Sequence, residues 1–305
     1  MPITLPPISR RRFLKGAVAA TGAVALGSRF SFGANATPAD PNRLALLSDT
    51  HISPDKNYLH KTGIKVWDQY QQVTREVLAL EQRPAALLVN GDCALDHGTA
   101  AAYATFTEGL DPIRTAGVPV HLGLGNHDAR ADFANAFPTD DVRVKEITDH
   151  TVSIVRLPTV DWYILDSLVK TKYTPGALGP AQLAWLAKSL DANPDRPSVL
   201  MMHHQPDTRA EKANGLTDTQ ALLEIVHPRK QVKAVLFGHT HIWTHYEQEG
   251  IHFVNLPTTA YVFDPKQPAG WVDAQLSQKG MKLELHAIAP NHPQDKQTLD
   301  LPWRA

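Results

Sequence analysis

The stretch "VPVHLGLGNHD", residues 118–128, decides how the rest of the chain is interpreted. Its β-branched and apolar first half is typical of a buried strand. An amide, an imidazole and a carboxylate follow that strand directly, at Asn126, His127 and Asp128. A single strand that ends in polar residues is common in proteins and does not by itself indicate a functional site. Several such strand ends in one chain would indicate one.

Four more predicted strands end in the same way. Their polar ends are Asp49 and His51 in residues 43–51, Asp92 in residues 84–92, His203 and His204 in residues 197–206, and His239 and His241 in residues 232–241. Helical patterns over residues 66–81, 99–117 and 179–190 separate these strands. Strands that alternate with helices predict an α/β protein with partly parallel sheets, whose carboxyl ends meet at one edge. The five polar ends are therefore expected to converge.

The converging residues have the chemistry of metal ligands. The set comprises Asp49, His51, Asp92, Asn126, His203, His239 and His241. Carboxylate, imidazole and amide groups together suit first-row metals such as Mn, Fe, Co and Zn. Seven groups are too many for one tetrahedral ion, but they fit two ions that share a bridging carboxylate. Such pairs, roughly 3.5–4 Å apart, favour in-line displacement at phosphorus by a hydroxide held between the ions.

The order D-x-H, G-D, G-N-H-D, H, G-H-x-H over about residues 43–262 resembles the calcineurin-like metallophosphoesterases. Within that family the chain is most similar to the bacterial branch of cyclic-nucleotide and glycerophosphodiester phosphodiesterases, since "LDS…GALGPAQLAWLAKSL" also matches that branch. The resemblance implies an α/β fold, namely a four-layer αββα sandwich of two mixed β-sheets. It places the metal site at the carboxyl ends of the strands.

The resemblance also implies a role for each residue. One ion would take Asp49, His51, Asp92 and His241, and the other would take Asp92, Asn126, His203 and His239. His127 would contact the phosphoryl group and help the leaving oxygen depart. Asp128 would bond a backbone amide or orient an imidazole. Asp96, just after the G-D block, is a candidate partner for the catalytic histidine.

The chain departs from the family pattern at a few positions. It has Gln205 after His203 and His204, where the branch usually reads H-H-P-P. We expect His203 to be the ligand, whereas His204 either touches the substrate or packs. Leu95 stands where purple acid phosphatases have tyrosine, which argues against an iron–tyrosinate centre.

Two further side chains lie just beyond the last metal block. Trp243 and His245 either line the substrate cleft or pack on a strand-to-strand turn. The sequence leaves both alternatives open.

The amino terminus has the pattern of an export signal. Residues 9–15, "SRRRFLK", fit the twin-arginine motif, and a weakly apolar stretch of residues 16–27 follows. That stretch is shorter than the about 20 residues that a bilayer span needs. Small residues at "ANA", 34–36, offer a signal-peptidase site. We expect a protein exported in folded form by the twin-arginine translocation machinery, and then periplasmic or secreted.

The composition limits the kinds of partner that the protein can bind. Cleavage after residue 36 removes five basic residues and no acidic ones, which shifts the formal net charge from −1 to −6. An acidic protein is poorly suited to bind nucleic acid through its phosphate backbone. The single cysteine, Cys93, excludes an internal disulfide and is expected to be a small buried hydrophobe.

The predicted organisation is a signal peptide over residues 1–36, one phosphoesterase domain over residues 37–290 and a polar surface tail over residues 291–305. The predicted function is hydrolysis of small phosphoesters, with phosphodiesters favoured. The cofactors would be two divalent or mixed-valence ions of Mn, Fe, Zn or Co. The alternatives are a phosphomonoesterase of the same fold and a non-catalytic metal-binding protein of the envelope. The oligomeric state stays open, with a homodimer as one option.

Overall fold

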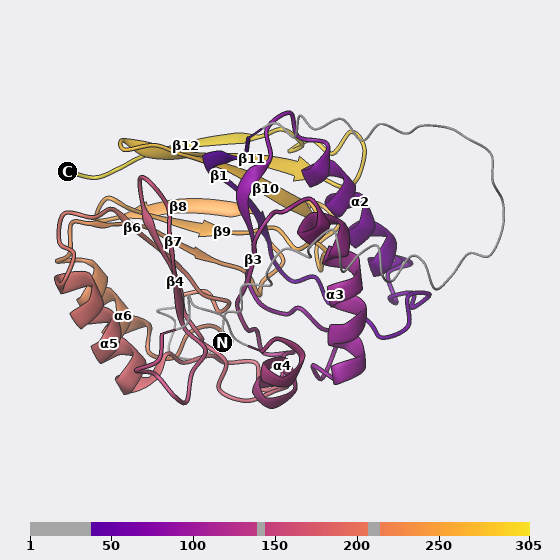
Figure 1. Ribbon diagram of the computed structural model, residues 1–305, viewed down its shortest axis with the longest axis horizontal. Coiled ribbons are helices and arrows are strands. Elements are labelled where there is room, and N and C mark those ends of the chain that lie inside the picture. The colour runs from indigo at the N-terminus through magenta and orange to yellow at the C-terminus, as the bar shows by residue number, and fades with distance from the viewer. Residues whose placement is uncertain (1–37, 139–143, 207–213) are drawn as a thin grey trace.

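The computed structural model describes residues 38–138, 144–206 and 214–305, so the predicted signal peptide lies outside the described part of the chain. In these residues the strands form two mixed sheets of six strands each. Two sheets and the helices outside them make the predicted four-layer arrangement (Figure 1). Across the same ranges, no helix has the length and apolar character that a membrane span requires.

The first sheet contains the strands that deliver the first three polar ends. In spatial order its strands are β12 (Thr298–Pro302), β11 (Gly280–Ala287), β10 (Gly270–Leu276), β1 (Asp40–Leu47), β2 (Pro84–Val89) and β3 (Val120–Leu122). Strands β1, β2 and β3 are parallel, whereas β10, β11 and β12 add to them in antiparallel fashion. The carboxyl ends of the parallel strands therefore share one edge.

The second sheet delivers the histidine ends. In spatial order its strands are β4 (Ser153–Arg156), β5 (Asp161–Ile164), β6 (Ser198–Met201), β7 (Val232–Phe237), β9 (Ile251–Asn255) and β8 (Thr244–Gln248). Strands β5, β6, β7 and β9 run parallel, and the two outer strands are antiparallel to their neighbours.

Helices cover the outer face of each sheet. Helices α2 (Val66–Leu78), α3 (Ala100–Thr115) and α4 (Arg130–Ala136) lie on one side of the molecule, and α5 (Gly179–Asp191) and α6 (Thr219–Val226) lie on the other (Figure 1). Three apolar clusters fill the spaces between the layers, with one cluster between the two sheets and one under each group of helices.

Strand β1 shows how the sequence sets these layers. Successive strand side chains point to opposite faces of a sheet. Leu44 and Leu46 accordingly pack between the two sheets, while Ala45 and Leu47 pack under the helices α2 and α3. A strand buried on both faces reads as a continuous apolar run, which is the pattern of residues 44–47.

The structure corrects the expectation of a polar tail over residues 291–305. Strand β12 pairs along β11, from Glu284 opposite Thr298 to Gly280 opposite Pro302. Leu301 is buried in the cluster between the sheets. The guanidinium of Arg304 donates hydrogen bonds to five backbone carbonyl oxygens. The pattern T-L-D-L-P alternates as an edge strand does, although the polar residues before it conceal this.

Candidate metal centre

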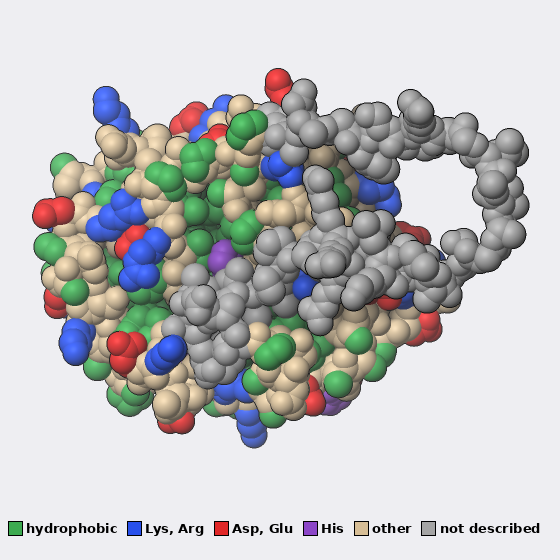
Figure 2. Space-filling model, viewed as in Figure 1, with side chains coloured by type: hydrophobic (Ala, Val, Ile, Leu, Met, Phe, Trp, Pro, Cys, Tyr) green, Lys and Arg blue, Asp and Glu red, His purple; other side chains and the backbone are tan. Residues whose placement is uncertain are grey.

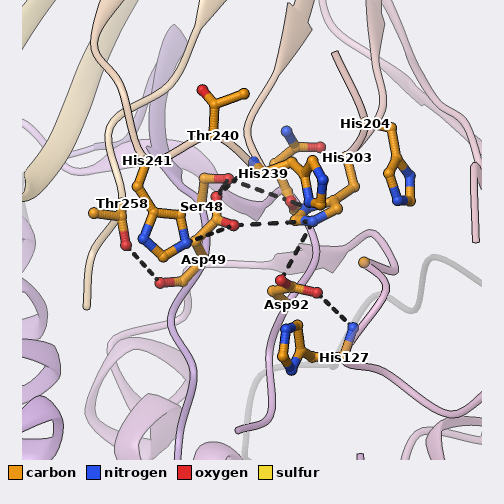
Figure 3. Close-up of polar contacts among 12 residues, drawn as sticks. Ser48, Asp49, Asp92, His127, His203, His204, His239, Thr240, His241 and Thr258 are labelled. Atoms are coloured by element: carbon orange, nitrogen blue, oxygen red, sulfur yellow. Dashed lines mark hydrogen bonds and ion pairs between the residues drawn. The ribbon is translucent and has the colours of Figure 1, made fainter. Parts of the chain in front are cut away.

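The strand ends converge as predicted. Asp49 and His51 follow β1, Asp92 follows β2, Asn126 follows β3, His203 follows β6, and His239 and His241 follow β7. Their side chains gather in one place, which Figure 3 shows for most of them. All seven predicted ligands therefore lie around one centre between the two sheets.

A first group of ligand atoms surrounds His241. Its Nε2 lies 3.3 Å from Oδ1 of Asp49 and 3.2 Å from Nε2 of His51. The other carboxylate oxygen of Asp49 accepts hydrogen bonds from the hydroxyl of Ser48, at 2.5 Å, and from the backbone N–H of His239, at 3.1 Å. Oδ1 of Asp49 is buried, faces this group and has no hydrogen-bond partner in the described part of the chain.

A second group surrounds Asp92, His203 and His239. Oδ2 of Asp92 lies 3.4 Å from Nε2 of His203 and 3.6 Å from Nε2 of His51, so this one oxygen faces both groups. Asn126 lines the same cavity, and its buried Oδ1 has no hydrogen-bond partner among the described residues. The carboxylate of Asp92 is therefore in the position that a bridging ligand requires.

Backbone carbonyls orient three of the imidazoles. Nδ1 of His203 lies 2.9 Å from the carbonyl oxygen of Asn90, and Nδ1 of His241 lies 2.5 Å from that of Tyr261. Nε2 of His239 lies 2.9 Å from the carbonyl oxygen of Asn214. A carbonyl can only accept, so each of these nitrogens donates, and in the neutral ring the other nitrogen offers a lone pair to a metal ion. Metal-binding histidines commonly have this second partner.

The charges of the cluster favour a bound cation. Burial lowers the pKa of His51 to about 3, so this imidazole is neutral and can act as a ligand at neutral pH. Burial also disfavours a charged His203, but the carboxylates of Asp92 and Asp49 outweigh burial and raise the pKa of His203 to about 10. A proton on His203 thus offsets two buried carboxylates. A metal ion would replace that proton, because metal binding releases protons from its ligands.

The backbone at these residues is strained. Asp49, His51, Asp92, His239 and His241 have φ values of 52°, 44°, 46°, 70° and 56°. The left-handed region costs a residue other than glycine about 1–3 kcal/mol, and such strain gathers at functional sites. A strand that ends in this conformation turns its side chain toward the sheet edge rather than continuing the pleat.

Close contacts explain why the G-N-H and G-H patterns begin with glycine, at Gly125 and Gly238. A Cβ atom on Gly125 would overlap the carboxylate of Asp92, and a Cβ atom on Gly238 would overlap the hydroxyl of Ser48. These close approaches let the loops after β3 and β7 reach the cluster.

His127 and Asp128 differ in role. His127 is half-buried, lines the cavity and has its ring centroid 5.0 Å from that of His51. Asp128 is fully buried and accepts hydrogen bonds from the backbone N–H groups of Gly125, at 2.9 Å, and Cys93, at 3.2 Å. The expectation that Asp128 bonds a backbone amide is confirmed, and Cys93 is buried as expected.

Asp96 differs from expectation. Its carboxylate forms ion pairs with Lys172 and, at 2.5 Å, with His97 rather than with His127. Asp96 has a positive φ of 69°, its side chain is about half exposed, and it is not among the residues that line the cavity.

His204 and Trp243 pack instead of lining the cavity. His204 is fully buried, its Nδ1 lies 2.8 Å from the hydroxyl of Ser167, and Figure 3 shows it to one side of Asp92. The option of substrate contact by His204 is thus corrected, because other side chains cover its ring. The indole of Trp243 donates to Gln297 at 2.8 Å and packs in the cluster between the sheets.

Several residues of the site escaped the sequence analysis. They are Ser48, which binds Asp49, and the cavity-lining residues Thr174, Asn214, Tyr261 and Phe263. The segment that follows β9 supplies two of them and is tied to Asp49 by Thr258, whose hydroxyl donates to the Asp49 carbonyl oxygen at 3.0 Å. Phe263 lies 22 residues after His241, and its exposure is visible only in the structure, so the sequence offered no local signal for it.

Two mixed sheets that hold a buried Asp/His cluster with room for two ions define a dinuclear metallohydrolase. The chain belongs to the calcineurin-like phosphoesterase family, whose model matches residues 42–243. Members of this family use two divalent metal ions and hydrolyse phosphoric esters, and the cluster described above fits such a pair. A model of the twin-arginine translocation signal matches residues 7–27, which indicates export to the periplasm or beyond.

Similarity to individual proteins supports this family assignment. The chain is 28% identical over 251 residues to a 3',5'-cyclic adenosine monophosphate phosphodiesterase CpdA of Vibrio vulnificus, covering 80% of this chain and 86% of that protein. It is 27% identical over 199 residues to a probable glycerophosphodiester phosphodiesterase GpdQ of Arcobacter nitrofigilis, covering 64% and 70%. A dimetal phosphatase from Danio rerio shares the fold, with a TM-score of 0.64 at 15% identity over 87% of this chain and all of that chain.

Proposed function

We propose that this protein is a metal-dependent phosphodiesterase of small phosphodiesters, with a cyclic nucleotide as the leading substrate. One ion is held by Asp49, His51, Asp92 and His241, and the other by Asp92, Asn126, His203 and His239. The observation that supports this proposal most is the position of Asp92, whose Oδ2 lies 3.6 Å and 3.4 Å from imidazole nitrogens of the two groups.

The bound ions would supply positive charge to the phosphoryl oxygens and lower the pKa of a water molecule. Hydrolysis forms a bond from the water oxygen to phosphorus and breaks one ester P–O bond, so the leaving oxygen must gain a proton. His127 is the protein group suited to deliver it, because it lines the cavity and its buried Nδ1 has no other partner among the described residues.

Two features support a diester over a monoester. Relatives of this chain are named for the cleavage of cyclic nucleotides and glycerophosphodiesters. The cavity wall includes the aromatic residues Tyr261 and Phe263 beside the polar Thr174 and Asn214. An apolar rim suits the second ester substituent, which a monoester lacks.

A substrate panel on protein purified from the export compartment tests this proposal, with bound metal measured in parallel. We expect kcat/KM for 3',5'-cyclic nucleotides or glycerophosphodiesters to exceed that for the matching monoesters. Asp92→Asn protein prepared in the same way controls for contaminating phosphatases. Preference for monoesters would establish the phosphomonoesterase alternative. No hydrolysis of any ester with both ions bound would establish a non-catalytic metal-binding protein.

A further inference from the structure

Phe263 combines exposure with a fixed position at the cavity. Its side chain is 69% exposed, the largest exposure among the large hydrophobic side chains of the described residues. It lines the cavity, and its ring stacks on that of His241 with centroids 4.4 Å apart and planes at 17°. One ring face thus rests on a candidate metal ligand.

Backbone hydrogen bonds and a ring contact hold the segment around Phe263 against the metal centre. The N–H groups of Thr259 and Ala260 donate to the carbonyl oxygens of Ser48, at 2.8 Å, and Asp49, at 3.2 Å. Tyr261 stacks on His60, with ring centroids 3.7 Å apart and planes at 9°. These contacts set the position of Phe263 relative to the ions before any substrate binds, which lowers the entropy that binding must overcome.

The size of the cavity leaves part of a substrate outside it. Its volume is about 240 Å³. Pockets that enclose a whole small ligand have roughly 300–1,000 Å³. In the proposed complex the phosphoryl group would lie near Asp92 and His127, so a second ester substituent would extend over the rim. Phe263 is the most exposed of the large apolar side chains that line the cavity.

We propose that Phe263 is a specificity-determining residue whose free ring face stacks on a planar aromatic substituent of the substrate, such as a nucleobase. This inference rests on the proposed phosphodiesterase function. A flat, apolar surface stacks on any base because every base has a π face. A planar base can cover the whole free face of a single ring, whereas a quaternary ammonium group is usually held by several rings that surround it.

The test compares two substrates in one enzyme. Phe263→Ala, Phe263→Tyr and wild type are loaded with Mn²⁺, and kcat/KM is measured for a 3',5'-cyclic nucleotide and for glycerophosphocholine. Loss of one stacking contact should lower the ratio of the two kcat/KM values roughly 5- to 100-fold in Phe263→Ala. Phe263→Tyr should keep the ratio. Equilibrium binding of the nucleoside monophosphate product should weaken in Phe263→Ala by a similar factor.

Controls separate this inference from other effects. Tyr246→Ala removes an exposed aromatic ring on β8 that stacks on Phe253, outside the cavity lining, and should keep the wild-type ratio. Metal content is measured in each variant, because Phe263 also contacts His241. An unchanged ratio in Phe263→Ala, or an equal loss for both substrates, would overturn the inference. Failure of the proposed function itself would instead appear as no diester turnover in wild type.

Discussion

The backbone N–H of His127 donates a hydrogen bond of 2.8 Å to Oδ1 of Asp92. The other oxygen of the same carboxylate faces the imidazoles of His51 and His203. The candidate bridging ligand therefore fixes the backbone of the candidate acid. This contact joins the loops after β2 and β3, so the position of His127 depends on Asp92.

His127→Ala should leave two ions bound per chain and slow turnover by about 10²–10⁴-fold, the usual contribution of a positioned acid or base. The backbone N–H that binds Asp92 is retained in this variant, so the bridge keeps its partner. Steady-state kinetics with metal analysis of the same sample checks both parts. His97→Ala removes a neighbouring exposed histidine and should have near wild-type turnover. Wild-type rates in His127→Ala would remove this residue from the mechanism.

Asp92→Asn should lower the content of both ions, because Oδ2 of Asp92 faces both groups. The amide keeps the size of the side chain and removes the negative charge. Metal per chain is measured after equilibration at a fixed free metal concentration. Asp273→Asn serves as the control, since it alters an equally buried carboxylate that pairs with Arg43 on β1. Retention of two ions in Asp92→Asn would contradict a shared bridge.

Asp96→Asn should reduce turnover by no more than about fivefold. Asp96 pairs with the partly exposed Lys172 and His97, and exposed ion pairs contribute about 0.2–1 kcal/mol. The measurement is kcat for the diester that wild type prefers. A loss as large as that of His127→Ala would restore Asp96 as the partner of the catalytic histidine.

Arg304→Ala should destabilise the domain by about 2 kcal/mol and lower Tm by about 4–8 °C. The guanidinium of Arg304 donates to carbonyl oxygens at the end of α6, including those of Val226 at 2.9 Å and Arg229 at 2.6 Å, and a cation is favourable at a helix carboxyl end. Lys56→Ala removes an exposed ion pair with Glu108 and a cation–π contact with Trp67, and it should change stability far less. Equal Tm values for the two variants would argue against this role for the carboxyl-terminal segment. Calorimetry checks both.

The convergence of the candidate ligands could be predicted from the sequence because each lies at the end of an apolar run. Asp49, Asp92 and His203 follow strands whose burial on both faces gives an unmistakable pattern. The two candidate ligands of D-x-H lie on one short loop, and so do the two histidines of G-H-x-H. Residues that are close in the sequence are therefore also close in the structure. Local sequence therefore specified the centre well.

The rest of the site depends on contacts that span the chain. Tyr261 and Phe263 reach the cluster only because the segment after β9 binds Ser48 and Asp49 about 210 residues earlier. The partner of Asp96 is Lys172, which is 76 residues away. Edge strands such as β8 and β12 are short and largely exposed, so they lack the continuous apolar run of a buried strand. Pairing, rather than local pattern, makes these segments strands.

Figure 2 concerns the prediction that the protein does not bind the phosphate backbone of nucleic acid. On the coloured part of the face drawn there, which belongs to the described residues, basic and acidic side chains are interspersed and do not form a basic stripe. Recognition of nucleic acid by charge requires such a stripe. The homodimer remains a prediction.

The position of two ions around Asp92 is the central claim, and anomalous diffraction from crystals grown with Mn²⁺ tests it most directly. We expect two manganese peaks, one among Asp49, His51 and His241 and the other among Asn126, His203 and His239, with the carboxylate of Asp92 between them. A single peak, or manganese bound only elsewhere on the chain, would contradict the account.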